Sequence, residues 1–107
     1  MNKVERQMTP IKSLGEIVSQ VGSELGVSDW LEIDQHRIRE FANVTDDHSA
    51  IHLDRNIARA AGFEDTFAHG FLTLSMLMKL QEDVLPIISG VKESFNYGFD
   101  RVRFLSR

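Results

Sequence analysis

An aspartate and a histidine five positions apart, Asp47 and His52, lie in the polar stretch FANVTDDHSAIHLD at residues 41–54. On an α-helix this spacing would place the two side chains about 140° apart, so they converge only if the segment is not helical. Residues 44–53 show no apolar periodicity and are predicted to form a polar loop. A carboxylate and an imidazole facing one point can hold a water molecule and move its protons, which typically contributes ~10² to 10⁴ in rate.

A second motif, FAHGFLTLS at residues 67–75, opens an apolar stretch that is predicted to become helical near His69 and Gly70. The first amides of a helix have no partner within it, and a glycine there lets another molecule approach the backbone closely. Ala68, His69 and Gly70 therefore form a candidate site for an oxyanion that develops during a reaction.

Each motif also has a plainer interpretation. Taken alone, Asp47 and His52 are more typical of a turn cap and of a hydrogen-bonded histidine, and it is the second motif that favours catalysis. His69 can simply cap its helix. A metal cluster is a further, less favoured alternative, because a loop with this spacing fixes no ligand geometry. Its ligands would be His48, His52, Asp47 and Asp54.

Three helices are predicted ahead of the second motif. Apolar residues recur at three- and four-residue steps over residues 11–25, which predicts an N-terminal amphipathic helix that ends at Gly26. Asp34 is the predicted cap of the next helix. Asp54 is the predicted cap of a short third helix, which Gly62 ends.

The rest of the chain predicts a helix inside a sheet. The helix that starts near Gly70 is apolar around nearly its whole circumference, so we expect it to be buried on most sides, as by a sheet wrapped around it. Residues 94–106 alternate apolar and polar positions and then change phase, which predicts a long strand with a bulge near Gly98. One strand pair is marginal on its own, so another chain or further strands would have to complete the sheet.

Composition narrows the function. The 107 residues carry 12 Lys and Arg against 16 Asp and Glu, a formal net charge of −4, and contain no cysteine. The acidic balance argues against a nucleic-acid partner, and neither a thiol nucleophile nor a thiolate metal site is possible. Neither a signal peptide nor a stretch long enough to span a membrane is found. We therefore expect a cytoplasmic protein with a single domain over residues 1–107.

The order T-x-D-x-x-x-I-H-x-D, followed by A-H-G-F-L-T, resembles the MaoC-like dehydratases and (R)-specific enoyl-CoA hydratases. The flanks ELGVSDW and NYGFDRVRF are similar to the nodulation protein N branch of that family. The resemblance implies an α+β hotdog fold, in which an antiparallel sheet wraps a long central helix, usually in a dimer or higher homo-oligomer. It also implies coenzyme A or acyl-carrier-protein thioesters as substrates, with no metal or redox cofactor.

Carried onto this sequence, the resemblance implies that Asp47 and His52 are the catalytic pair and that the Gly70 amide polarises the thioester carbonyl. Substrate contacts are implied for Ala68, His69 and Phe71. The implied reaction is a reversible syn addition of water to a trans-2-enoyl thioester, which gives an (R)-3-hydroxyacyl thioester.

Three features depart from the family pattern. Asp46 stands where many hydratases carry glycine, and Ser49 and Ala50 stand where the usual motif has Asn and Pro. Relatives continue with further strands beyond the position of Arg107, so we expect the domain to be incomplete at its C-terminus. Two other functions stay open: a catalytically inactive module that assembles with itself or another subunit, and, less favoured, an acyl-CoA thioesterase.

Overall fold

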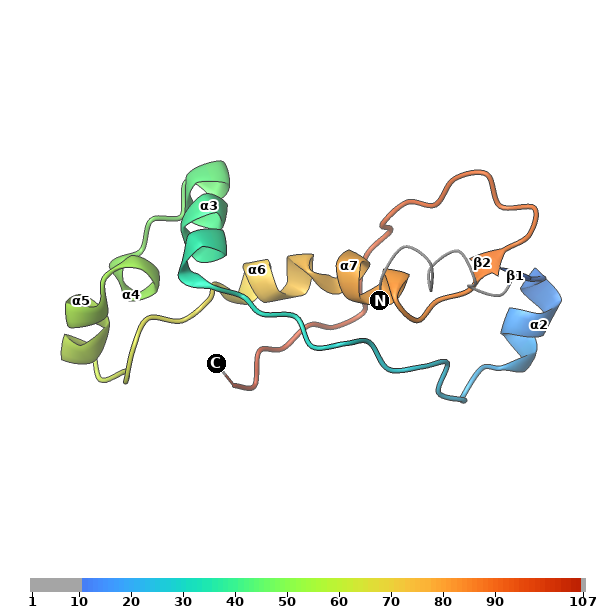
Figure 1. The fold of residues 1–107 in the computed structure, drawn as a ribbon, viewed down its shortest axis with the longest axis horizontal. Coiled ribbons are helices and arrows are strands. Elements are labelled where there is room, and N and C mark those ends of the chain that lie inside the picture. Colours follow the sequence, from blue (N-terminus) through green and yellow to red (C-terminus); the bar gives the residue numbers. More distant parts are fainter. Residues whose placement is uncertain (1–10, 107) are drawn as a thin grey trace. The chain divides into compact units, whose positions relative to one another are not determined.

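The computed structural model describes residues 11–106, which divide into two compact units, each described by itself below. The first unit comprises residues 11–30 and Met78–Val102, and the second comprises Leu31–Leu77 and residues 103–106. The elements are shown in Figure 1. In chain order they are β1 (Ile11–Lys12), α2 (Leu14–Ser19), α3 (Gln35–Thr45), α4 (Ala50–Leu53), α5 (Arg55–Ala60), α6 (Gly70–Ser75), α7 (Leu77–Glu82) and β2 (Ile87–Ile88). That the chain forms a single domain stays a prediction.

In the first unit, α2 begins with a capping box. The Ser13 hydroxyl accepts a hydrogen bond from the Glu16 amide at 3.1 Å, and the Glu16 carboxylate accepts one from the Ser13 amide at 3.3 Å. This exchange satisfies two donors that a helix start leaves unpaired. The helix is only six residues long, so the helix predicted over residues 11–25 is too long at both ends. Before it lies β1, which pairs in parallel with β2, and after it Gly22 turns the chain at φ +89°.

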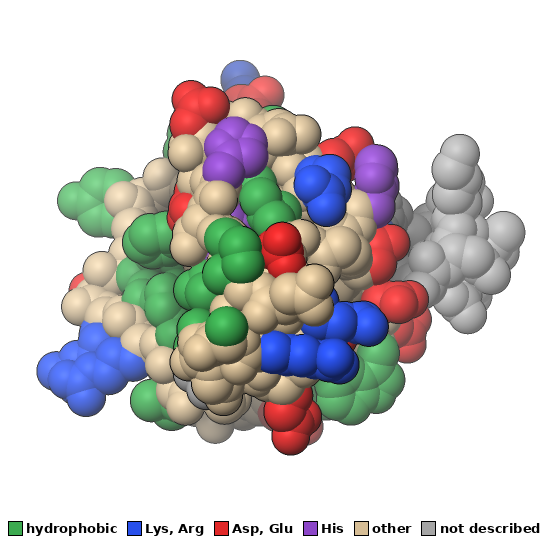
Figure 2. Space-filling model, turned by 90° about the vertical axis from the view of Figure 1, so that its left-hand side faces the viewer, with side chains coloured by type: hydrophobic (Ala, Val, Ile, Leu, Met, Phe, Trp, Pro, Cys, Tyr) green, Lys and Arg blue, Asp and Glu red, His purple; other side chains and the backbone are tan. Residues whose placement is uncertain are grey.

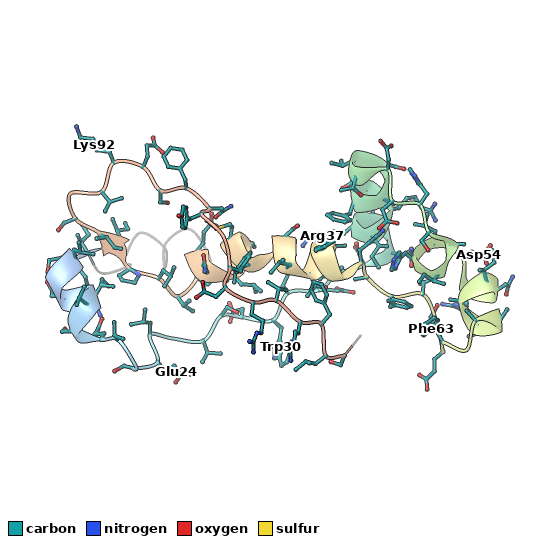
Figure 3. All side chains as sticks on the ribbon, turned by 180° about the vertical axis from the view of Figure 1, so that it is seen from behind. Glu24, Trp30, Arg37, Asp54, Phe63 and Lys92 are labelled. Carbon is teal, nitrogen blue, oxygen red and sulfur yellow. The ribbon has the colours of Figure 1, made fainter. Side chains whose placement is uncertain are left out.

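In the second unit, carboxylates start two of the helices, as the sequence predicts. Asp34 accepts a hydrogen bond from the Arg37 amide at 2.9 Å and begins α3. Asp54 accepts bonds from the amides of two residues of α5, at 2.9 and 3.2 Å. Gly62, at φ +100°, follows the end of α5. Figure 3 shows Asp54 where α4 meets α5 and Phe63 on the segment that leaves α5. The predicted caps and the glycine stop are confirmed.

The interior of the second unit is small and partly polar. The buried apolar side chains among the described residues are Ile38, Ala42, Ala58 and Leu72, all of which belong to this unit. Two histidines are buried with them, His52 at 8% and His69 at 3% exposure. The two histidines of the predicted motifs are therefore part of the interior.

Two predicted elements differ from the structure. The long apolar helix is divided at Met76 into α6 and α7, and of its apolar residues only Leu72 is buried, with Phe71 68% exposed. Residues 91–106 contain no helix or strand. A strand must exchange its backbone hydrogen bonds with a neighbour, and the ladder that the described residues form is two residues long on each side. The long central helix wrapped by a sheet is therefore not found within residues 11–106.

Large apolar side chains are exposed in both units. Trp30 and Tyr97 are fully exposed, and Phe95 and Leu105 are 87% and 90% exposed. Figure 2 shows hydrophobic side chains interspersed with acidic, basic and histidine side chains on the face that it draws. Within residues 11–106, no helix combines the length and the apolar character that a membrane crossing requires.

Candidate active site

His52 is held on α4 with a defined tautomer. Its Nδ1 lies 2.7 Å from the carbonyl oxygen of Phe67. A carbonyl oxygen only accepts hydrogen bonds, so Nδ1 carries the hydrogen of the neutral ring and Nε2 keeps a lone pair. The Phe67 ring also meets the His52 ring edge-on, with centroids 5.0 Å apart. His52 is therefore oriented to accept a proton or a hydrogen bond at Nε2.

The backbone of His52 is held by Gln35, the first residue of α3. The Gln35 side-chain amide donates to the His52 carbonyl at 2.8 Å, and its carbonyl oxygen accepts from the Thr66 hydroxyl at 2.7 Å. One side chain thus joins α3, α4 and the segment that carries Phe67. Sequence reasoning missed Gln35 and Thr66, because these contacts span 17 and 31 residues and leave no local pattern.

His69 is stacked directly on His52. The ring centroids are 3.9 Å apart and the planes are inclined by 29°. The Phe41 ring lies 5.0 Å away on a tilted plane. His69 Nε2 lies 3.0 Å from the backbone carbonyl of Asp47, so this nitrogen carries the hydrogen, while the buried Nδ1 has no hydrogen-bond partner. The sequence predicts a substrate contact for His69, but this burial favours a different role for its side chain.

Asp47 lies beside the two stacked rings. One carboxylate oxygen of Asp47 and one ring nitrogen each of His52 and His69 lie within 4.8 Å of one another. Asp47 itself is exposed, and its carboxylate accepts a long 3.4 Å bond from the Ser49 amide. Convergence of Asp47 and His52 is predicted from a loop at residues 44–53. The structure brings the two residues together, but the segment includes the end of α3 and all of α4, so the loop prediction is only partly right.

The same three residues are poorly arranged to share one metal ion. A histidine lone pair lies in the plane of its ring, and the planes of two stacked rings inclined by 29° meet far beyond the ~2.1 Å of a zinc–nitrogen bond. The alternative ligands of the predicted cluster are engaged elsewhere. His48 Nε2 contacts the Asn43 side chain at 2.9 Å, and Asp54 caps α5. The ring stacking and these hydrogen bonds argue against a shared metal ion at either set of residues.

Gly70 begins α6 at the wall of a cavity of about 390 Å³. A Cβ atom on Gly70 would lie 2.8 Å from the Phe104 ring, so a larger residue would displace that ring. Phe71 meets Phe104 edge-on, with centroids 5.9 Å apart. The lining residues are Phe67, Ala68, Gly70, Thr73, Phe104, Leu105 and Ser106. Of the predicted substrate contacts, Ala68 lines the cavity and Phe71 is exposed beside it; Gly70, the predicted oxyanion donor, also lines the cavity.

The sequence matches known proteins over most of its length. The MaoC like domain family matches residues 16–107. This chain belongs to the MaoC-like family. It is 47% identical over 95 residues to nodulation protein N of Rhizobium meliloti (strain 1021), covering 88% of this chain and 59% of that protein. It is 40% identical over 97 residues to 3-hydroxyacyl-thioester dehydratase Z of Mycobacterium tuberculosis (strain ATCC 25618 / H37Rv), covering 91% of this chain and 64% of that protein.

The MaoC-like chain therefore spans about three fifths of the length of these two relatives. The predicted membership of the MaoC-like dehydratases and the similarity to nodulation protein N are confirmed. Family membership implies the hotdog fold, and the described residues contribute helices and a small sheet to it.

One departure of this MaoC-like chain from its family pattern has a backbone explanation. Asp46 ends α3 in the left-handed conformation, at φ +60° and ψ 22°. Glycine enters this region without steric cost, and aspartate is among the few other residues that tolerate it. The Asp46 side chain is exposed, and the backbone conformation of this residue forms the turn between α3 and Asp47.

Proposed function

We propose that this MaoC-like chain is a hydro-lyase that interconverts trans-2-enoyl and (R)-3-hydroxyacyl thioesters of coenzyme A or an acyl carrier protein. The observation that carries the proposal is the separation of at most 4.8 Å between the Asp47 carboxylate and the His52 ring nitrogen. Two hydrogen bonds of about 2.8 Å that meet at the tetrahedral angle of a water oxygen span about 4.6 Å. The upper limit of 4.8 Å is compatible with one water molecule held between the two side chains.

In the proposed hydration, Asp47 holds the water while His52 Nε2 takes one of its protons. The water oxygen bonds to the β-carbon, and the electron pair of the double bond moves through the α-carbon to the thioester oxygen. The Gly70 amide would donate a hydrogen bond to that oxygen, where charge accumulates. His52 then returns the proton from Nε2 to the α-carbon. Because one group removes and returns the proton from one side, the addition is syn.

The cavity beside Gly70 supports an acyl thioester as the ligand. Its volume of about 390 Å³ lies within the ~300 to 1,000 Å³ of small-molecule sites. Phe67, Phe104 and Leu105 supply apolar surface for an acyl chain, and Ala68 lies next to the amide that would face the carbonyl. The steps proposed here assign no role to a metal ion or a redox cofactor.

The test is hydration of a short trans-2-enoyl-CoA, followed by loss of the enoyl absorbance. We expect Asp47→Asn to lower the rate by about 10², because the water would lose the carboxylate that positions it for His52. Asp46→Asn is the matched control, because it removes the adjacent charge from an exposed residue, and it should stay within about twofold of the parent. Equal activity of the parent and Asp47→Asn would overturn the proposed catalytic pair.

A thiol reagent added to the same assay separates hydration from thioester hydrolysis. A hydratase consumes the enoyl absorbance without releasing free coenzyme A, whereas a thioesterase releases one thiol per substrate. Thiol release without hydration would move the assignment to the thioesterase.

Self-association is a second candidate role, favoured by the exposed apolar side chains. Phe95, Tyr97 and Leu105 expose between 87% and 105% of their surface in this chain. Large exposed apolar side chains leave water when a second chain packs on them, which favours association. Sedimentation velocity over a hundredfold range of concentration should detect a dimer or a larger homo-oligomer. A monomer throughout that range would exclude this role for the chain.

A further inference from the structure

The proposed steps leave one buried ionisable side chain of the site unused, that of His69. We propose that His69 is a positioning residue that holds the Asp47 backbone and the His52 ring at their working separation. The inference rests on the proposed function for its kinetic consequence, but the contacts that carry it belong to His69 itself.

The first contact is the hydrogen bond from His69 Nε2 to the Asp47 carbonyl, 3.0 Å long. The Asp47 carboxylate is exposed, and the intramolecular bond described for it is the long 3.4 Å one from the Ser49 amide. The direction of that carboxylate therefore depends on where its backbone is held. His69 supplies this hold from 22 residues away along the chain.

The second contact is the stack on His52. His69 covers one face of the His52 ring at a centroid distance of 3.9 Å, while the Phe67 carbonyl fixes the ring edge at Nδ1. Phe41 lies against His69 in turn, at 5.0 Å, so His69 is itself held in place. A ring held at one face and one edge cannot turn about its side-chain bonds without breaking a contact. Displacing reacting groups by about 1 Å can cost about 10² in rate.

His69 also joins the pair to the candidate oxyanion site. It immediately precedes Gly70 and is the N-cap of α6, where its carbonyl accepts bonds from the amides of Leu72 and Thr73 at 3.0 and 3.2 Å. A single residue therefore contacts Asp47 and His52 through its side chain and fixes the start of α6 through its backbone.

Because His69 Nδ1 has no hydrogen-bond partner, the side chain acts on the catalytic pair through the Nε2 hydrogen bond and the ring stack. Three variants separate these two contributions. His69→Gln keeps a donor that can reach the Asp47 carbonyl but removes the aromatic face. His69→Phe keeps the aromatic face but removes the donor. His69→Ala removes both. His48→Gln is the matched control, because His48 is exposed and contacts the Asn43 side chain outside the stack.

We expect kcat for enoyl-CoA hydration to fall about 10-fold in His69→Gln and in His69→Phe and about 100-fold in His69→Ala, with KM within about twofold throughout. His48→Gln should match the parent in both constants. A residue that contacts substrate would instead raise KM, and a rise in KM at constant kcat would overturn the inference.

A second measurement does not depend on turnover. Long-range ¹H–¹⁵N spectra should show His52 as the Nδ1–H tautomer in the parent and in His48→Gln, and its ring signals should shift or broaden in His69→Ala, where the ring has lost its stacking partner. An unchanged His52 signal in folded His69→Ala would overturn the inference whatever the kinetics. If the parent is inactive while the His52 signal responds as expected, the proposed function fails and the positioning role stands.

Discussion

Residues 34–75 and residues 91–102 are both rich in apolar positions, yet only the first region buries some of them. In the first region, Asp34 and Asp54 cap helices, and Ala42 and Ala58 are fully buried. In the second, the alternating residues Phe95, Tyr97 and Phe99 are 59% to 105% exposed. A helix satisfies its backbone within itself, whereas a strand depends on a neighbour. Asp47, His52 and Gly70 therefore lie in the region that needs least from the rest of the fold.

The comparison predicts that substitutions lower the free energy of unfolding much more in the first region than in the second. We expect Ala58→Leu to lower the free energy of unfolding by about 1 to 3 kcal/mol, because Ala58 is fully buried and the added atoms must displace neighbours. Tyr97→Ser, at a fully exposed side chain, should change it by less than about 0.5 kcal/mol. Urea unfolding followed by circular dichroism measures both changes.

Ala60→Leu is the control for Ala58→Leu, because Ala60 lies on the same helix α5 and is exposed. Its effect should be as small as that of Tyr97→Ser. If Tyr97→Ser instead destabilised the chain as much as Ala58→Leu, the second region would be buried in solution and the contrast between the regions would be lost.

The sequence predicted the parts of the fold that depend on short-range chemistry. The caps at Asp34 and Asp54 and the stop at Gly62 each act within a few residues, so their residue types suffice. The predicted strand at residues 94–106 failed for the opposite reason. Its alternation is real, but a strand also requires a partner, and a single sequence does not state which segment provides it.

For the site, the sequence predicted the residues better than their arrangement. The two motifs contain Asp47, His52 and Gly70, and the structure brings the first two together. The roles of Gln35 and His69 were not predictable, because each depends on a contact with a residue 17 or more positions away. The four-residue helix α4 is likewise too short to leave a periodic signal.

A smaller effect is predicted at the turn that presents Asp47. Asp46 lies in the left-handed region, which costs most residues with a side chain about 1 to 2 kcal/mol. Asp46→Gly should therefore be more stable to urea than Asp46→Ala by about 1 kcal/mol, although the greater freedom of glycine in the unfolded chain offsets part of the gain. Equal stability of the two variants would show that the turn relaxes in solution. The left-handed conformation at residue 46 would then not contribute to the stability of residues 34–75.

The smallest predicted effect is the pH dependence contributed by Asp65, which lies on the segment after α5. The Arg55 guanidinium, bonded at 2.9 Å, and the Thr66 amide lower the pKa of Asp65 below its ordinary value of 3.8. The unfolded chain therefore binds this proton more readily, so the stabilisation is present above pH 3.8 and is lost as the pH falls through the lowered folded value.

Asp65→Asn isolates this charge, because the amide keeps the shape and an oxygen that can accept from Thr66. Unfolding midpoints of the parent and the variant should differ near pH 6 and converge as the pH falls below 3.8, with a smaller difference in high salt. The difference should be slight, since the two side chains are 62% and 46% exposed. A difference that did not change with pH would mean that the Arg55 charge contributes nothing to stability. Uncharged hydrogen bonds, such as the one from the Thr66 hydroxyl to the Gln35 side chain, would then hold this segment against the site.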